Sequence, residues 1–267
     1  MPGAVPGLVR ARARTRPAST VRGHLYAGTS GFAYPGWAPI FYPPGLRPVE
    51  LLRSYASKLP ACELNNTYYR WPDEDRIRSW AGDTPETFRF SVKAQRSSAL
   101  RAIGTPKGSP ADPPGQVARL IAPLDAFAGR LGTVLFRVPG EIGRADHRLA
   151  GLLEAWPRAV PLTVELQHES WHVDETFAAL RAHGAVLCAT ELPEDALPPT
   201  IRLTGPFLYL RLRRHDYSAA ELTAWAARID PFLASGTDVY VFFRHDPVAR
   251  ATELAATLQA EALRLAA

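Results

Sequence analysis

Residues 87–93 read Thr-Phe-Arg-Phe-Ser-Val-Lys, a run in which polar residues alternate with aromatic and β-branched ones. This alternation predicts a β-strand, and the run ends in a charged residue, Lys93. Seven further runs of similar character complete a set of eight predicted strands: 24–28, 61–65, 87–93, 132–138, 161–167, 185–190, 206–212 and 238–244. Eight is the number of strands that a closed α/β barrel requires.

Helical patterns separate these strands almost throughout the chain. They cover residues 48–59, 74–82, 116–130, 146–156, 174–183, 218–233 and 247–265. The link from the sixth to the seventh strand, residues 191–205, has no clear helical pattern and contains several prolines. The sequence therefore predicts an α/β protein, a TIM-type (β/α)8 barrel formed as a single domain by residues 23–267, whose last β-α units are partly irregular.

The stretch Gly104 to Gly115 contains four prolines. Because proline interrupts regular helices, we expect an irregular excursion on the loop side of the third strand. Such an excursion would either cover the barrel mouth as a lid or form a surface insertion without a role.

The charge of the chain is distributed unevenly. The net charge is +5, but five of the 31 Lys and Arg residues lie in residues 1–22, which contain no acidic residue. The remaining 26 basic residues balance 26 acidic ones, so a disordered basic tail, residues 1–22, is expected to precede a neutral barrel. A neutral body gives no global attraction to polyanions, so any such attraction must come from the tail or from local clusters.

No run approaches the roughly 20 apolar residues of a membrane span, and no secretory signal is recognisable. We therefore expect a cytoplasmic protein without membrane contact. Cys62 and Cys188 each lie within a predicted strand, where a thiol usually behaves as a small buried hydrophobe. No nucleotide-binding loop, nucleophile elbow or zinc ribbon is present, so no cofactor is predicted.

Charged residues end most of the predicted strands. They are Glu63, Lys93, Arg137, Glu165, Arg211 and Arg244. The loops after the strands of an α/β barrel form its active site, so charge at these positions indicates a functional site at the mouth. Alternation places Asn65 on the face of Glu63, and Gln167 on the face of Glu165, which we expect to point inward.

These side chains support two kinds of chemistry. Glu63, Lys93 and Glu165 are candidate catalytic residues, because burial and neighbouring charges can shift their pKa values toward neutrality. The guanidinium groups of Arg137, Arg211 and Arg244 suit a carboxylate or phosphate ligand. The alternative is a buried ion-pair network that only stabilises the barrel.

Histidines and aromatic residues follow several strands. His168 and its neighbours supply nitrogen and oxygen atoms suited to a divalent metal, but their spacing is not a metal signature, and helix capping explains them equally well. No metal ligand is therefore assigned. Tyr69, Arg70 and Trp171 are candidate ligand-binding residues near the mouth, although aromatic residues in such loops more often pack to hold the loops in place.

Several motifs in this chain occur in the same order and spacing in a known family. They include Gly28-Thr29-Ser30-Gly31-Phe32, Glu63-Leu64-Asn65-Asn66-Thr67-Tyr68-Tyr69-Arg70, Phe88-Arg89-Phe90-Ser91-Val92-Lys93 and Tyr209-Leu210-Arg211-Leu212. From about Tyr26 to the C-terminal helix the chain resembles the YecE-like family, the domain of unknown function 72 (DUF72). The resemblance implies a TIM-type barrel similar to the sugar isomerase and endonuclease-four-like group, and no particular reaction. The recurrent polar positions of the family fall on Glu63, Asn65, Tyr69, Lys93, Glu165, His168 and Arg211.

The chain departs from this pattern in ways that make the mouth more basic. The family usually has Gln near the end of the fourth strand and Arg after the glutamate of the fifth, whereas this chain has Arg137 and Gln167. Because neighbouring strands lie about 4.8 Å apart, we expect the guanidinium of Arg137 to occupy much the same space as the arginine that the family usually has after the fifth strand. We therefore expect Arg137 to contact Glu165. Arg213-Arg214 and Arg244-His245 replace less basic pairs after the last two strands.

Three functions agree with these observations. The first is an enzyme-like barrel whose mouth binds an anionic, phosphate-bearing ligand such as a sugar phosphate or nucleic acid, with Glu and Lys acid–base chemistry. The second is a metal-dependent phosphodiesterase similar to endonuclease four. The third is a nucleic-acid-binding module without turnover.

Overall fold

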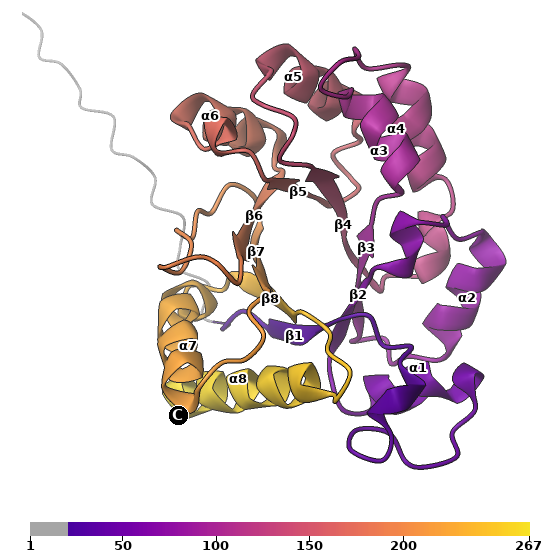
Figure 1. Ribbon diagram of the computed structural model, residues 1–267, viewed down its shortest axis with the longest axis vertical. Coiled ribbons are helices and arrows are strands. Elements are labelled where there is room, and N and C mark those ends of the chain that lie inside the picture. The colour runs from indigo at the N-terminus through magenta and orange to yellow at the C-terminus, as the bar shows by residue number, and fades with distance from the viewer. Residues whose placement is uncertain (1–20) are drawn as a thin grey trace, which may run out of the picture.

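Eight parallel strands form a closed barrel in the computed structural model, which describes residues 21–267 (Figure 1). Each strand pairs with the next one along the chain, and β8 pairs with β1. The strands are β1 Leu25–Ser30, β2 Ala61–Leu64, β3 Arg89–Lys93, β4 Leu131–Val138, β5 Leu162–Leu166, β6 Val186–Glu191, β7 Phe207–Leu212 and β8 Asp238–Phe243. All eight predicted strands and the predicted fold are thus confirmed. The predicted disordered tail falls largely on residues outside this range.

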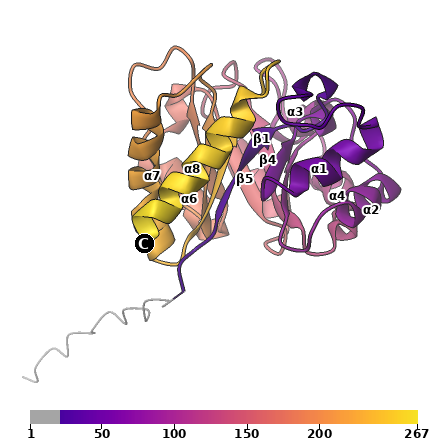
Figure 2. The ribbon, with the colours of Figure 1, turned by 90° about the horizontal axis from the view of Figure 1, so that it is seen from below.

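Helices surround the barrel. The α-helices are α1 Leu51–Ala56, α2 Glu74–Gly82, α3 Arg96–Ile103, α4 Pro113–Ile121, α5 Asp146–Ala155, α6 Asp174–His183, α7 Ala219–Ala234 and α8 Arg250–Ala266. Short 3-10 helices are η1 Pro35–Trp37, η2 Pro48–Glu50, η3 Asn66–Tyr68, η4 Leu124–Phe127 and η5 Glu169–Trp171. In side view, α8 packs over β1 and α7 and completes the ring (Figure 2). The link from β6 to β7 contains no helix, as predicted.

The third β-α unit differs from the prediction. The helix α3, which was not predicted, precedes the expected excursion Gly104 to Gly115, and α4 begins within the excursion. Both helices pack in the outer layer with α5, and no residue of the excursion lines the mouth cavity. Pro113 does not break α4 but begins it, because the first helical position needs no backbone N–H donor. The Asp112 side chain caps this helix by accepting a hydrogen bond from the N–H of Gly115 at 3.0 Å.

The barrel interior has an apolar lower half and a polar upper half. Tyr26, Tyr240 and Tyr209 stack in sequence in the lower half, with ring centroids 4.8 and 6.3 Å apart. Leu135, Val186 and other buried residues fill the space around them. The charged inward side chains lie at the carboxyl ends of the strands, which is where α/β barrels form their active sites.

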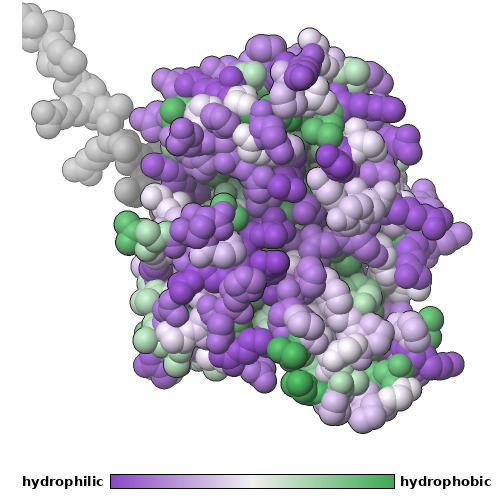
Figure 3. Space-filling model, in the orientation of Figure 1, coloured by the Kyte–Doolittle hydropathy of each residue, from purple (hydrophilic) through white to green (hydrophobic). Residues whose placement is uncertain are grey.

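The surface seen down the barrel is hydrophilic at its centre (Figure 3). Apolar residues on this face are scattered toward the edges, above the helices and loops. Within residues 21–267, no helix has the length and apolar character needed to cross a bilayer.

Close contact between β1 and β2 requires glycine at position 28. A Cβ atom there would lie 1.9 Å from the carbonyl oxygen of Ala61. We expect Gly28→Ala to lower the free energy of unfolding by about 2–3 kcal/mol or more, because the strands must separate. The matched control is Gly151→Ala in α5, where no atom lies within 4 Å of the added methyl. This control should raise stability by about 0.5–1 kcal/mol. Urea denaturation measures both, and equal effects would contradict the close packing.

Candidate functional site

A buried ion network lies just below the barrel mouth. Arg211 on β7 donates from one terminal nitrogen to both carboxylate oxygens of Glu165 on β5, at 2.8 and 2.9 Å. Its other terminal nitrogen donates to Oε1 of Glu63 on β2 at 2.8 Å. The exposure of these three residues is 2 % or less. Strands from three different parts of the wall are therefore joined through one guanidinium group.

Hydroxyl groups complete this network. Tyr209 donates to Oε2 of Glu63 at 2.7 Å and forms a further hydrogen bond with Ser91 at 2.6 Å. Thr190 donates to Oε1 of Glu165 at 2.8 Å. Burial alone would raise the pKa of Glu165, but the charge and hydrogen bonds of Arg211 outweigh burial and lower it to about 2. Both carboxylates thus match the ion-pair network considered from the sequence, and their oxygens are already bonded.

A cavity of about 530 Å³ lies above the network. Its lining comes from the ends of β1, β2, β3, β4, β7 and β8 and the loops after them. The lining residues are Ser30, Tyr34, Asn65, Asn66, Tyr68, Tyr69, Lys93, Arg137, Arg211, Arg213, Arg244 and His245. No carboxylate is among them.

The positive charges of this lining are mostly uncompensated. Within residues 21–267, no carboxylate oxygen lies within 4.0 Å of the side-chain nitrogens of Lys93, Arg213 or Arg244. Arg137 is closer to a carboxylate, with Nε 3.8 Å from Oε2 of Glu165. Burial lowers the pKa of Arg213, and the neighbouring Arg211 adds to this effect. The cavity therefore has the charge and shape of an anion site.

Lys93 differs from the arginines because it is both buried and unpaired. Its exposure is 8 %, and its amine lies 4.6 Å from the ring centre of Tyr68. Burial lowers the pKa of Lys93 most, Arg211 and Arg137 lower it further, and Glu63 and Glu165 raise it, with a result of about 8. Part of the Lys93 population is therefore neutral near physiological pH.

The structure brings half of the predicted site residues to this cavity. Those that line it are Asn65, Tyr69, Lys93, Arg137, Arg211 and Arg244. Oδ1 of Asn65 is buried and lacks a hydrogen-bond donor among the described residues. Tyr69 is 82 % exposed at the cavity edge. The expected contact between Arg137 and Glu165 is confirmed, and Arg137 also donates to Oε1 of Gln167 at 2.7 Å.

Four predicted ligand-binding residues lie elsewhere. Arg70 borders a surface cavity next to α2, and Gln167 borders a cavity at the side of the barrel. Nδ1 of His168 accepts from the N–H of Ser170 and caps η5. Trp171 is fully buried and donates from Nε1 to the carbonyl oxygen of Ile142 at 2.8 Å. His168 and Trp171 therefore hold a loop in place, and neither lines the mouth cavity.

Two basic residues of the cavity were absent from the predicted site. Arg213 follows Arg211 by two positions, so strand alternation extended past the end of β7 places both on the same face. His245 stacks on Tyr34, with ring centroids 4.8 Å apart and planes inclined by 12°. Burial lowers the pKa of His245, and Arg244 lowers it further. The alternation signal identifies Arg213, whereas no simple sequence pattern identifies the His245 stack.

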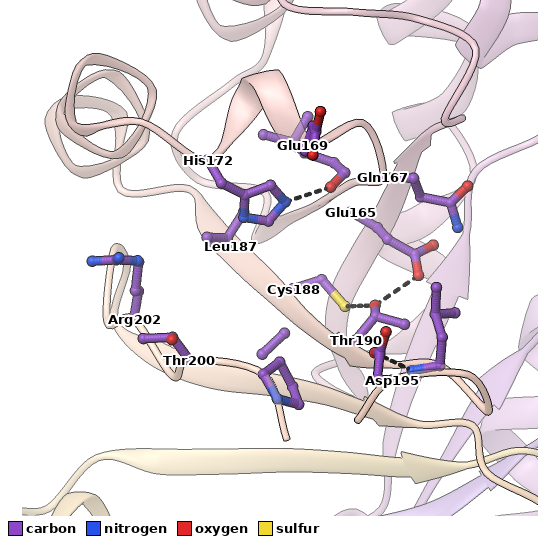
Figure 4. A pocket seen from close by; sticks show the side chains of 14 residues that line it. Glu165, Gln167, Glu169, His172, Leu187, Cys188, Thr190, Asp195, Thr200 and Arg202 are labelled. Atoms are coloured by element: carbon purple, nitrogen blue, oxygen red, sulfur yellow. Dashed lines mark hydrogen bonds between the residues drawn. The ribbon is translucent and has the colours of Figure 1, made fainter. Parts of the chain in front are cut away.

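A second cavity of about 390 Å³ lies beside the mouth, between β5 and β6 (Figure 4). The two strands pair at only two positions, the later of which joins Val164 to Leu187. Beyond this point the strands are joined by the hydrogen bond from Thr190 to Glu165, which is visible in Figure 4. The cavity thus borders the seam of the barrel and reaches the network from the side.

The arrangement of metal-ligand residue types bears on the phosphodiesterase alternative. Residues 21–267 contain no group of three or more His, Cys, Asp or Glu side chains positioned to hold a metal ion. The two carboxylates nearest the mouth are bonded to Arg211. The donor set at the mouth therefore does not fit a catalytic metal.

Comparison with known proteins identifies the family of the chain. The model of the family described as protein of unknown function DUF72 matches residues 26–266. The chain belongs to the DUF72 family. The UPF0759 protein YunF of Bacillus subtilis (strain 168) is 25% identical, over 83% of this chain and 89% of that protein. This family membership agrees with the resemblance noted in the sequence and adds no activity.

Two solved DUF72 structures have a similar fold. One, from Thermotoga maritima MSB8, is 27% identical, with a TM-score of 0.73 over 90% of this chain and 99% of that chain. The other, from Enterococcus faecalis V583, is 19% identical, with a TM-score of 0.73 over 90% of this chain and 95% of that chain. The barrel is thus shared across DUF72 proteins of low sequence identity.

Removal of Arg211 should destabilise the barrel strongly. We expect Arg211→Met to lower the free energy of unfolding by about 3–5 kcal/mol, because two buried carboxylates lose their counter-ion. Arg53→Met is the matched control, since Arg53 forms an exposed ion pair with Asp83 at 2.9 Å. The control should cost less than about 1 kcal/mol. Urea denaturation measures both, and a cost of Arg211→Met as small as that of the control would show that water screens the network.

Proposed function

We propose that the barrel mouth binds a small anionic ligand, most simply one that carries a phosphate group. The observation that supports this most directly is the unpaired positive charge of Lys93, Arg213 and Arg244 in a cavity without a carboxylate. Lys93 is buried and Arg213 half-buried, and partly desolvated charges without counter-ions are unfavourable, so an anion that enters the cavity gains more from these two residues than it would at an exposed surface.

The size and lining of the cavity suit part or all of a small molecule. A volume of about 530 Å³ lies in the range of ligand sites, which is roughly 300–1,000 Å³. Arginine forks match the oxygen geometry of phosphate, and Asn65 and the ring of Tyr69 supply polar and stacking contacts for the rest of the ligand. A sugar phosphate or the end of a nucleic-acid strand meets these requirements.

The network below the cavity has a supporting part in this proposal. Arg211 and Glu165 are buried and bonded to each other, so they position the wall and tune the charge of the mouth. Lys93 is the predicted catalytic residue with an unbonded functional atom facing the cavity. Any proton transfer to the ligand therefore centres on Lys93 and not on the two carboxylates.

Loss of a cavity cation should weaken anion binding. We expect Arg244→Gln to reduce sulfate or phosphate affinity by about tenfold, because one charge-assisted hydrogen bond contributes roughly 1.5–3 kcal/mol. The fold should be unaffected, since Arg244 is exposed and has no carboxylate within 4.0 Å in the described part of the chain. Titration calorimetry measures the affinity, with Arg53→Gln on the outer surface as the control. Equal affinities in Arg244→Gln and the control would contradict the proposal.

Replacement of Lys93 should separate stability from binding. Lys93→Met removes a buried charge whose pKa is lowered by folding, so the variant should be more stable than the parent at pH 7, by on the order of 2 kcal/mol. It should also bind sulfate at least about tenfold more weakly. Thermal unfolding and calorimetry test the pair of effects. Lower stability together with unchanged sulfate affinity would assign Lys93 a structural role alone.

The pH dependence of binding reports the same amine. The charged groups around Lys93 are Arg211, Arg137, Glu63 and Glu165, and its pKa is about 8. Sulfate remains a dianion from pH 6 to pH 10, so its affinity should be flat below about pH 7.5 and fall as the pH rises through about 8, when the amine loses its proton. Calorimetry across this range should show the fall in the parent and not in Lys93→Met. A flat profile in the parent would contradict the assignment.

A further inference from the structure

Lysine is rare in this chain, and one of its lysines is at the cavity. The 31 basic residues include only three lysines, Lys58, Lys93 and Lys107. Lys58 and Lys107 are exposed, whereas Lys93 is buried at the end of β3. Where only positive charge is needed, arginine provides it permanently and with more donors. Lysine alone offers an amine that can lose its proton and act as a nucleophile.

The surroundings of Lys93 are those of a nucleophilic amine. Within residues 21–267, the amine makes no hydrogen bond, and no carboxylate oxygen lies within 4.0 Å of it. The ring of Tyr68 covers one side of it, and the mouth cavity is open to it on another. Burial and nearby guanidinium groups favour the neutral form, which is the common way to activate a lysine for attack on a carbonyl group.

We propose that Lys93 forms a Schiff base with an aldehyde or ketone that carries a phosphate group. This inference rests on the proposed function, because the arginines of the mouth would hold the phosphate while the carbonyl group faces the amine. In this proposal the cationic residues of the cavity have two different roles. Arg213 and Arg244 bind charge near the opening, and Lys93 reacts at the buried end.

The reaction balances without a further reagent. The lone pair of the neutral Lys93 amine attacks the carbonyl carbon, and the π electrons of the C=O bond move to oxygen. The carbinolamine then loses this oxygen together with the two amine hydrogens as water, and a C=N bond forms. Nothing is oxidised or reduced. When the imine is protonated, its positive charge takes the place of the lysine charge near Glu63 and Glu165, which act on the amine electrostatically.

Borohydride trapping with two matched aldehydes tests the proposal. The full chain is incubated at pH 7.5 with pyridoxal 5′-phosphate or with pyridoxal, which lacks the phosphate, and is then reduced with sodium borohydride. Peptide mass spectrometry assigns the adducts among Lys58, Lys93 and Lys107. We expect the phosphate-bearing aldehyde to modify Lys93 in about tenfold or greater excess over the two exposed lysines. The reason is that the lowered pKa of Lys93 leaves more of its amine in the neutral, reactive form at pH 7.5. Pyridoxal is less reactive toward every amine because its free hydroxyl adds to its own aldehyde, so the comparison uses the preference for Lys93 over the two exposed lysines. This preference should be much smaller with pyridoxal, and excess sulfate should protect Lys93 from the phosphate-bearing aldehyde.

Two variants and a parallel binding measurement separate the possible results. Lys93→Met and Lys93→Arg should both lose the adduct at position 93. Lys93→Arg keeps a positive charge at this position, so it provides the test if Lys93→Met does not fold. If the parent binds sulfate by calorimetry but Lys93 is not modified, the Schiff base is refuted and the proposed function stands. If both aldehydes show the same preference for Lys93 over the exposed lysines and sulfate neither binds nor protects, the nucleophile is supported and the phosphate site is refuted. Absence of both binding and modification refutes both.

Discussion

The bridge that Arg211 makes between Glu63 and Glu165 is the interaction on which the upper half of the barrel depends. It joins β7 to β2 and β5 across the interior, where an apolar filling would ordinarily hold the strands. Buried ions are costly to desolvate, so this arrangement is stable only because every carboxylate oxygen has a donor. The bridge also engages the negative charges nearest the mouth. The arginines and lysine above it are therefore left with positive charge that the fold does not neutralise.

Strand alternation explains why the sequence predicts so much of this site. Phe88, Phe90 and Val92 face the helices, so Ser91 and Lys93 must face the interior, and the same reasoning applies to each strand. The exchange that places Arg137 opposite Glu165 is likewise a matter of neighbouring strands and register. Such features are local or follow from the order of the strands, and both are readable in a linear sequence.

The depth of each side chain within the barrel and its hydrogen-bond partners cannot be predicted from strand alternation. Alternation assigns Glu63 and Lys93 to the same interior, but it does not show that one lies in a bonded network and the other faces open space. Trp171 has the sequence setting of a stacking platform, yet a backbone carbonyl 29 residues away accepts its N–H. Pro113 is a helix breaker in most contexts and a helix initiator here, since Asp112 supplies the cap. Each outcome depends on tertiary contacts.

The short pairing between β5 and β6 has a mechanical consequence. A barrel wall held throughout by backbone ladders has a nearly fixed circumference, but here the last part of one seam is closed by the hydrogen bond from Thr190 to Glu165. This part of the rim therefore depends on a contact between two side chains and not on a continuous backbone ladder. Glu165 also accepts from Arg211, so one carboxylate takes part both in closing this seam and in the buried ion network. The continuity of the barrel wall at this seam and the charge balance of its interior thus depend on the same side chain, Glu165.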